Sequence, residues 1–384
     1  MKKQNEQRLV PKLRFKGFSE DWEQRKLKDM YEIIMGQSPL SKNYTEDYKY
    51  DILVQGNADL KDGKVIPRIY TKQVTKLAKP NSIIFTVRAP VGQIAINTKK
   101  VVIGRGVCSI EGDKFLYHKL EQLNNIKYWN KFSTGSTFDS INSNDLKNMV
   151  LHIPKNIEEK NRISHILDIL DSMITLHKRK IQVLKDQKNL YLNKMFISQQ
   201  GDVQLRFKGF TEPWEQLKMG EVFKYEQPTK YLVTSADYSD EYQTPVLTAG
   251  QSFILGYTDE TEGIKNASKT DPVIIFDDFT TGNHYVDFPF KIKSSALKIL
   301  SISDRSYDEY FTFYSLNRIK YSPQNHQRHW ISMFSRIKIN IPTIAEQASI
   351  GNLLRTIDNM ISLHNKKLNK LESLKKEYLN YLFI

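Results

Sequence analysis

The sequence predicts an α/β (α+β) fold, in which two mixed, sheet-dominated domains are joined by two long helices that form an antiparallel coiled coil. The main observation is an internal repeat: LRFKGFSEDWEQ at 13–24 returns as LRFKGFTEPWEQ at 205–216 with 10 of 12 positions identical. A second repeat aligns 163–197 with 350–384 and preserves 15 of 35 positions. The inserts between these copies do not align convincingly with each other. A period near 190 residues is much longer than that of a solenoid and therefore indicates two domains and two connectors.

The repeat is also circular. After YLN at 191 the chain runs on into the second LRFKGF, whereas the segment matching this continuation after YLN at 378 lies at the N-terminus. We therefore predict a pseudo-twofold circular organisation that tolerates circular permutation. The predicted segments are an N-terminal segment at 1–24 packing near the C-terminus, a first domain at 25–152, a first coiled-coil helix at 153–198, a repeat linker at 199–216, a second domain at 217–340 and a second coiled-coil helix at 341–384.

The two inserts contain short β-prone runs, such as SIIFTV and DPVIIF, that are broken by Gly, Pro and Asn. This pattern is typical of a sheet-dominated domain. Each insert also has one helical stretch, predicted at 115–132 in the first insert and at 308–319 in the second.

Both long helices begin with the sequence of a capping box, Asn156-x-x-Glu159 and Thr343-x-x-Glu346. An apolar seam follows with alternating spacings of four and three, the period of a coiled coil. The seam residues are Leu167, Leu170, Ile174, His177, Ile181 and Leu184 in the first helix, and Leu354, Ile357, Ile361, His364, Leu368 and Leu371 in the second.

Polar residues interrupt the seam. His177 and His364 are interpreted as residues that fix the register, because no other metal ligand falls at a suitable spacing on that face. Lys188 and Lys375 are expected to extend from the seam towards solvent. A helix of about 40 residues is roughly 60 Å long, so antiparallel pairing would place one domain at each end of a stiff rod.

The charge indicates the class of partner. The formal net charge is +14 and the pI is about 9.4, and such an excess usually binds phosphate in nucleic acid or on an anionic membrane. Simple solubility is the alternative explanation. The single cysteine excludes an internal disulfide, and we find neither a signal peptide nor an apolar run of about 18 residues. We therefore expect a cytoplasmic, soluble protein that binds nucleic acid and no membrane.

The candidate DNA-binding residues are cationic, amide, hydroxyl and aromatic side chains in loops, several of them beside Gly or Pro, where such groups can reach base edges and phosphates. In each case the alternative is an ordinary solvated side chain. The candidates are Arg88, Arg105, Ser136, Thr137, Asn142, Gln251, His284, Tyr285, Asn325, His326, Arg328 and His329. The neighbouring Trp330 is alternatively a packed core aromatic.

The sequence lacks the familiar catalytic motifs. It contains no phosphate-binding loop with the Walker pattern, no dinucleotide glycine fingerprint, no Cys/His cluster for zinc and no Asn/Asp-Pro-Pro-Tyr/Phe tetrad of an amino-methyltransferase. Asp277 and Asp278 are the residues considered for a metal site, but no partner carboxylate and lysine follow at nuclease spacing. We therefore predict no catalytic residue, no metal and no cofactor in this chain.

The duplicated helices, the divergent inserts and stretches such as SIIFTVRAPVGQIAI, PVLTAGQSFILGYT and DPVIIFDDFTTGNHYVDFPF together resemble the DNA specificity subunit of type I restriction-modification systems. In that family each insert is a target recognition domain for double-stranded DNA and the helices are the conserved regions. The resemblance implies that two modification (methyltransferase) subunits binding S-adenosylmethionine dock on the helices, and that restriction (motor-nuclease) subunits bind ATP and Mg.

Two domains on a rod would read a bipartite, asymmetric DNA target whose spacer is measured by helix length. Inserting four residues into one helix should then lengthen the spacer by about one or two base pairs. Three other functions remain open. They are a recognition chain of another restriction-methylation system, a self-sufficient methyltransferase or nuclease with unrecognised motifs, and a coiled-coil adaptor that binds no DNA.

Overall fold

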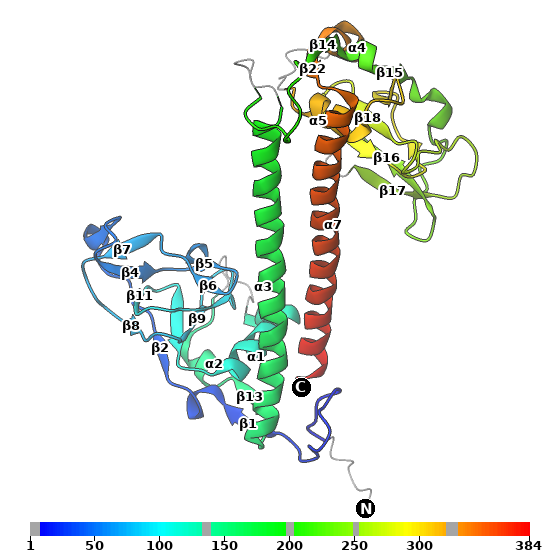
Figure 1. Ribbon diagram of the computed structural model, residues 1–384. Coiled ribbons are helices and arrows are strands. Elements are labelled where there is room, and N and C mark those ends of the chain that lie inside the picture. The colour runs from blue at the N-terminus through cyan, green and yellow to red at the C-terminus, as the bar shows by residue number, and fades with distance from the viewer. Residues whose placement is uncertain (1–7, 133–139, 197–202, 249–252, 320–328) are drawn as a thin grey trace, which may run out of the picture. The chain divides into compact units, whose positions relative to one another are not determined.

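The computed structural model describes residues 8–132, 140–196, 203–248, 253–319 and 329–384 (Figure 1). The chain divides into two compact units. Unit 1 comprises residues 1–179 and 365–384, and unit 2 comprises residues 180–364. The long helices α3 (Ile157–Lys194) and α7 (Ile344–Tyr381) each contribute to both units. None of the helices described has the length and apolarity needed to cross a membrane.

Unit 1 contains two sheets and a closing ribbon. The six-stranded sheet has the order β2 (Ile33–Met35), β12 (Val107–Ile110), β9 (Ile83–Thr86), β10 (Ile94–Ile96), β6 (Lys64–Val65) and β5 (Leu60–Lys61). The five-stranded sheet has the order β3 (Tyr44–Thr45), β7 (Ile69–Thr71), β4 (Asp51–Val54), β11 (Val101–Ile103) and β8 (Leu77–Ala78). The ribbon pairs β1 (Glu23–Lys26) with β13 (Val150–Ile153). The short helices are α1 (Lys114–Asn125) and α2 (Ser143–Lys147).

Unit 2 repeats this plan with fewer strands. Its larger sheet has the order β15 (Phe223–Glu226), β21 (Leu297–Ile302), β18 (Val273–Asp277) and β19 (Asn283–Val286). Its smaller sheet has the order β17 (Ile254–Thr258), β16 (Thr244–Leu247) and β20 (Lys291–Ile292), and the closing ribbon pairs β14 (Glu215–Lys218) with β22 (Lys338–Ile341). The short helices are α4 (Met219–Val222), α5 (Glu309–Asn317) and α6 (His329–Ser332).

The central strand of each unit explains the layering. In β9, Ile83 and Phe85 pack in the core beneath α1, while Ile84 faces the second sheet with residues of β11. Successive side chains of a strand point to opposite faces, so a strand buried on both faces reads as a continuous apolar run. The run VIIFD of β18 divides in the same way, because Ile274 and Phe276 pack in one core and Val273 and Ile275 in the other. The predicted fold class is confirmed in both units.

In each unit the segments of α3 and α7 lie side by side (Figure 1). In unit 1, Asp171 contacts Lys375 and Lys178 contacts Glu372, so the two helices run antiparallel. The predicted seam residues Leu167, Leu170, Ile174, His177, Ile181, Leu184, Leu354, Ile357 and Leu371 are buried, and Ile361, His364 and Leu368 are half-buried. The core therefore continues from each sheet into its helix pair.

The two seam lysines depart from expectation. Instead of extending to solvent, Lys188 Nζ lies 2.6 Å from Asp358 in unit 2, and Lys375 Nζ lies 2.5 Å from Asp171 in unit 1. The two pairs are equivalent, since both partners are offset by 187 positions in the repeat. A buried ammonium requires a countercharge, and an acidic residue on the facing helix supplies it. The seam thus contains one ion pair per unit in place of an extended lysine.

The repeated segments 13–24 and 205–216 form a clip in each unit. Leu13 N donates to Tyr381 O at 2.9 Å, and Leu205 N donates to Lys194 O at 2.9 Å, so each clip holds the end of one long helix. Arg14 and Arg206 bind the start of the other helix through bidentate contacts of 2.7–2.9 Å to the buried carboxylates of Glu159 and Glu346. These glutamates were expected to reach back to the helix caps. They pair with the clip arginines instead, because a guanidinium donates two charge-assisted hydrogen bonds to a buried carboxylate, and these are stronger than a hydrogen bond from a neutral backbone amide.

Candidate nucleic-acid interface

In unit 1, four loops meet at one end of the sheets. They follow β2, β4, β9 and β11, and backbone hydrogen bonds hold them together. Gln37 N donates to Ile103 O at 2.9 Å, Gly104 N to Val54 O at 2.8 Å, and Val87 N to Gly106 O at 2.9 Å. We call these loops, residues 36–38, 55–57, 87–92 and 104–106, loop cluster 1. Its backbone is fixed by the sheets, so its side chains are presented from a rigid base.

Glycine makes this packing feasible. A Cβ added to Gly36 would lie 2.0 Å from Gly104 O, and one added to Gly106 would lie 2.1 Å from Gln55 O. Both distances are far below any real contact, so only glycine permits the backbones to approach so closely. The glycines beside Arg105, which drew attention to it in the sequence, therefore have a structural role of their own.

Loop cluster 1 brings together two of the predicted residues, Arg88 and Arg105, and both are exposed. Their loops are adjacent through the bond between Val87 and Gly106. Neither guanidinium forms an ion pair within the part of the chain that the structure describes. Arg179, Arg318 and Arg336 likewise form none there. Ion pairs engage the arginines at the following positions: Arg8, Arg14, Arg25, Arg68, Arg162, Arg206, Arg305 and Arg355. Two uncommitted guanidinium groups on adjacent loops suit an anionic or guanine-containing ligand.

Sequence reasoning missed three polar side chains of the cluster. Ser38 Oγ accepts from Arg105 N at 3.1 Å, which ties the first loop to the last. Gln37 lies next to Ser38. Gln55 Nε2 is buried and finds no hydrogen-bond partner among the described residues. An amide donor of this kind is a candidate for reading a base edge. The signal was present in the sequence, since Gln37 and Gln55, like Arg105, stand beside a glycine.

Unit 2 has an equivalent loop cluster with different side chains. Lys293 N donates to Leu247 O at 2.9 Å and Asp278 N to Ala296 O at 3.1 Å, which matches the Gly104–Val54 and Val87–Gly106 bonds of unit 1. Loop cluster 2 comprises residues 278–282 and 293–296, next to the end of β16. Phe279 stands in the place of Arg88 and is 42% exposed. Lys293, Ser294 and Ser295 stand in the place of the Arg105 loop.

Two carboxylates hold the turn that presents Phe279. Asp277 accepts from Phe279 N at 3.0 Å and also from the hydroxyl of Thr280. Asp278 Oδ1 accepts from Trp330 N at 2.8 Å, and its other oxygen lies 3.6 Å from the buried ammonium of Lys298. Both carboxylates thus hold the turn in place.

His284 and Tyr285 separate from each other. They lie in strand β19 and not in a loop, so their side chains point to opposite faces. The exposed imidazole of His284 stacks on Phe253 with ring centroids 3.9 Å apart. Tyr285 packs against Tyr310 and Phe313 in the core of unit 2, and burial raises the pKa of its hydroxyl. We therefore carry His284 forward as a candidate and not Tyr285. Trp330 is 1% exposed, as a core aromatic would be.

The remaining predicted residues are less informative. Asn142 is the N-cap of α2: its oxygen accepts from Asn144 N and Asp145 N, and its amide donates to Asp145, so its polar atoms are already bonded. Outside the described residues lie Ser136, Thr137, Gln251, Asn325, His326, Arg328 and the side chain of His329. All of these stay predictions.

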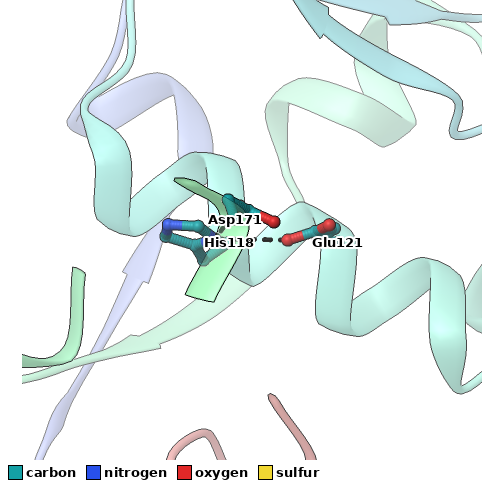
Figure 2. Close-up of side chains that lie close together, drawn as sticks. All are labelled: His118, Glu121 and Asp171. Carbon is teal, nitrogen blue, oxygen red and sulfur yellow. Dashed lines mark hydrogen bonds and ion pairs between the residues drawn. The ribbon is translucent and has the colours of Figure 1, made fainter. Parts of the chain in front are cut away.

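A second group of polar residues joins α1 to the long helices of unit 1. His118 is fully buried; its Nδ1 lies 3.2 Å from Glu121 and its Nε2 lies 3.0 Å from Asp168 (Figure 2 shows the ring with Glu121 and Asp171). Burial by itself lowers the pKa of His118, but the hydrogen bonds to Asp168 and Glu121 outweigh it, so the pKa is raised. A carboxylate faces each ring nitrogen, and this arrangement favours the imidazolium form, in which both nitrogens donate.

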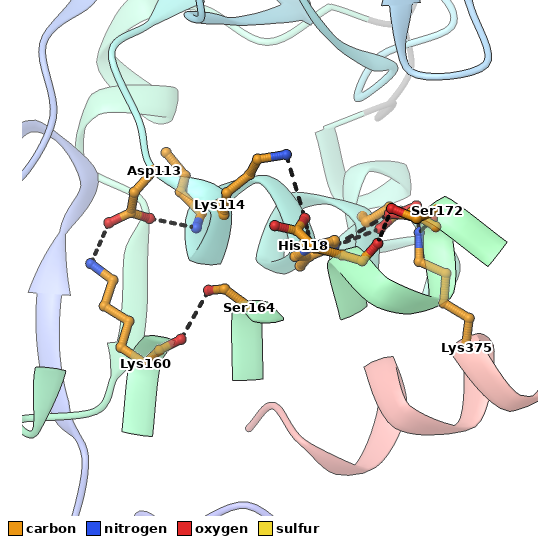
Figure 3. Close-up of polar contacts among 11 residues, drawn as sticks. Asp113, Lys114, His118, Lys160, Ser164, Ser172 and Lys375 are labelled. Carbon is orange, nitrogen blue, oxygen red and sulfur yellow. Dashed lines mark hydrogen bonds and ion pairs between the residues drawn. The ribbon is translucent and has the colours of Figure 1, made fainter. Parts of the chain in front are cut away.

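His118, Glu121 and Asp171 are spaced like metal ligands. Lys375, labelled in Figure 3, places its Nζ 2.5 Å from both Glu121 and Asp171, so one ammonium already forms an ion pair with each of the two carboxylates. Unit 2 anchors α5 at the equivalent position by other means: the hydroxyls of Tyr310 and Tyr314 donate to Asp358, at 3.0 and 2.5 Å. The group is therefore an anchor between domain and helix, and the structure gives no reason to assign it a metal.

Beside this anchor lies a cavity of about 1030 Å³, lined by residues of α1, α3, α7 and the β5–β6 hairpin. Its lining mixes both charge signs, including Lys64, Lys178 and Glu372. The lone Cys108 is elsewhere, buried in the core, and burial raises the pKa of its thiol, so it does not form a reactive thiolate. We therefore consider the two loop clusters as the candidate recognition surfaces.

Comparisons with known proteins identify the family to which the chain is similar. A family model described as "Type I restriction modification DNA specificity domain" matches residues 19–186 and again 211–373. The type I restriction enzyme EcoR124I/EcoR124II specificity subunit of Escherichia coli is 48% identical over 177 residues, which cover 44% of this chain and 43% of that protein. The putative MjaX specificity subunit of Methanocaldococcus jannaschii is 30% identical over 183 residues, covering 45% of this chain and 42% of that protein. The matches thus span less than half of these two relatives.

Two comparisons with Mycoplasma genitalium cover almost the whole chain. A putative type I specificity subunit from that organism is 20% identical over 391 residues, covering 98% of this chain and 97% of that protein. The crystal structure of the type I restriction-modification S subunit from M. genitalium superposes with a TM-score of 0.74 at 18% identity, covering 98% of this chain and 99% of that chain. The likeness supports the same fold over both repeats.

Proposed function

The chain belongs to the DNA specificity subunits of type I restriction-modification systems, and from this premise we propose that its two loop clusters read the two halves of a bipartite, asymmetric DNA target. The observation that carries the proposal is the pair of equivalent loop clusters. Each is held by the same backbone hydrogen bonds, yet the exposed side chains differ, Arg88 and Arg105 in one against Phe279 and Lys293 in the other. Identical frames with different side chains are suited to reading two different short sequences.

The partners follow from the same proposal. Two modification subunits dock on α3 and α7 and bring S-adenosylmethionine, and restriction subunits bring ATP and Mg; this chain contributes recognition and holds no cofactor. The net charge of +14 supports a DNA partner. We also place the complex in the cytoplasm, where bacterial DNA lies.

Genome sequencing tests the proposal directly. The chain would be co-expressed with its modification subunit in a host without DNA methylation, and modified bases would be mapped. We expect a split asymmetric motif with one modified adenine per strand. If the purified complex is assembled and the genome carries no modified motif, the proposal is wrong.

Three further measurements separate the alternatives. Binding of S-adenosylmethionine or turnover by the isolated chain would favour a self-sufficient enzyme. DNA affinity that is absent, or that does not fall with salt, would favour a coiled-coil adaptor. Assembly with a different set of subunits would indicate another restriction-methylation system.

A further inference from the structure

We infer that the two recognition domains read different kinds of base, the first a guanine through Arg88 and Arg105, the second a thymine through Phe279. The inference rests on the proposed function and assigns base classes to the two domains. It starts from the structural equivalence of the turns after β9 and β18. In the sheet, Thr86 pairs with Val107 and Asp277 pairs with Leu297, so the second residue after each strand end is Arg88 in unit 1 and Phe279 in unit 2.

In unit 1 the chemistry is that of a guanidinium pair. Arg88 and Arg105 are exposed, lie on adjacent loops and have no carboxylate partner among the described residues. A guanidinium donates two parallel hydrogen bonds to guanine O6 and N7, which is the most common specific contact in the major groove. The backbones of the two loops are held in place by the Val87–Gly106 and Arg105–Ser38 hydrogen bonds, at 2.9 and 3.1 Å. A fixed loop backbone limits the positions that each guanidinium can reach, which favours specific base recognition over loose electrostatic contact.

In unit 2 the same position holds an apolar ring. Phe279 can neither donate nor accept a hydrogen bond, and its turn is rigidified by the Asp277 carboxylate. An exposed phenyl ring on a rigid recognition loop is suited to the thymine C5-methyl group, the apolar feature of the major groove. The nearby cation is Lys293, whose ammonium lies over the Tyr238 ring at 5.5 Å. Loop cluster 2 therefore offers one apolar contact where loop cluster 1 offers two guanidinium forks.

A phosphate contact by the same arginines is the competing explanation, and charge-preserving variants distinguish it. Losing a base contact relaxes specificity at one position, whereas losing a phosphate contact weakens binding at every sequence and lowers the salt dependence. Lysine preserves the charge but lacks the bidentate fork. Arg88→Lys and Arg105→Lys should thus retain phosphate binding and lose guanine reading.

The experiment compares the modified motifs of the wild-type complex with those of Arg88→Lys, Arg105→Lys and Phe279→Ala complexes. We expect each lysine variant to relax one guanine in one half of the motif, with about 5- to 150-fold less discrimination at that base pair. Phe279→Ala should relax a thymine in the other half, and Phe279→Leu, which keeps an apolar contact, should retain it. Arg305→Lys is the matched control, because Arg305 is exposed but lies beyond the opposite end of β21.

The outcomes are distinguishable. No wild-type motif from an assembled complex would contradict the proposed function itself. A wild-type motif with both halves unchanged in the arginine and phenylalanine variants would overturn the inference alone. Arg88→Ala and Arg105→Ala complete the set: a uniform loss of modification in these two variants that the matching lysine variants restore would also overturn the inference, since that result identifies phosphate contacts. Assembly of each variant complex, checked by size and melting temperature, shows that a changed motif is not caused by misfolding.

Discussion

At the scale of single residues, the imidazolium of His118 gives unit 1 a pH-dependent anchor. The folded protein raises the pKa of His118 above its ordinary 6.5, so the folded state binds this proton more tightly than the unfolded chain. The stabilisation is fully present below pH 6.5 and is lost as the pH rises through the raised pKa. The groups facing the ring are Glu121, Asp168, Asp171 and, with opposite sign, Lys375; Lys114 pairs with Asp168 at 3.4 Å.

His118→Gln should therefore destabilise unit 1 more at pH 6 than at pH 8.5. The cost at pH 6 is about 2 kcal/mol, less than for a fully buried pair because Asp168 is about a third exposed. Thermal unfolding of wild type and variant at both pH values measures it. The tyrosine anchor of unit 2 supplies the control: Tyr314→Phe should cost the same at both. An equal cost of His118→Gln at pH 6 and 8.5 would mean that the ring does not change its charge between these two pH values, which would contradict the prediction.

The clip arginines make the second prediction at this scale. Arg14→Ala leaves the Glu159 carboxylate, only 1% exposed, without its partner, and should destabilise unit 1 by about 3–5 kcal/mol. Arg8→Ala is the matched control, because the Arg8–Asp21 pair is exposed and should contribute little. Melting temperatures of the two variants decide the point, and similar values would show that the clip does not depend on this ion pair.

Gly106 connects packing to recognition. Gly106→Ala places a Cβ 2.1 Å from Gln55 O, so the loop must shift, at a cost of about 1–3 kcal/mol. Gly56→Ala is the control in the same loop cluster, since its added Cβ meets nothing within 4 Å. We expect Gly106→Ala to alter one half of the modified motif and Gly56→Ala to leave it unchanged. The same motif from both variants would argue against loop cluster 1 as a reading surface.

At the scale of elements, the sequence predicts well whatever depends on a local period. The seam of α3 and α7 follows from spacing, and the strand run of β9 follows from its β-branched and aromatic residues, whereas α5 was predicted as the equivalent of the helical stretch in the first insert. The partners of Glu159 and Glu346 could not be predicted in this way, because Arg14 is 145 residues distant from Glu159 and a capping box is a purely local pattern. Tyr285 was misplaced because β19 was interpreted as a loop, which hid the alternation of its side chains. Loop cluster 1 escaped because its loops meet only through the order of β2, β4, β9 and β11 in the sheets.

The long helices carry a prediction of their own. Each contributes to both units, and a heptad inserted into each helix at the unit boundary, after Arg179 and after His364, preserves the seam. Seven residues add about 10 Å. If the helices set the distance between the half-sites, the modified motif should gain about three base pairs of spacer, with both halves unchanged. An unchanged spacer from an assembled complex would contradict the hypothesis that helix length sets the spacer.

At the scale of the whole molecule, the equivalence of the two clips predicts tolerance to circular permutation. Leu13 binds the end of α7 as Leu205 binds the end of α3, so a chain opened at residue 200 and joined from 384 to 1 by a short linker should fold. Its melting temperature should lie within a few degrees of the parent's, and its complex should modify the same motif. A permutant opened inside β9, which breaks the central strand of unit 1, should fail. Failure of the first permutant would refute the circular organisation.

The division into units also has a consequence for the order of events during synthesis. Unit 2 is one continuous stretch, 180–364, whereas unit 1 needs residues 365–384, which leave the ribosome after all of unit 2 has been made. Domains made first usually fold first, at synthesis rates of about 5–20 residues per second. Here the domain encoded first lacks two of its contacts until the C-terminal residues are made: the hydrogen bond from its clip to Tyr381 and the ion pair of its anchor with Lys375. The nascent chain therefore completes its second recognition domain before its first, and the incomplete first domain is the one exposed to chaperones and proteases in the interval.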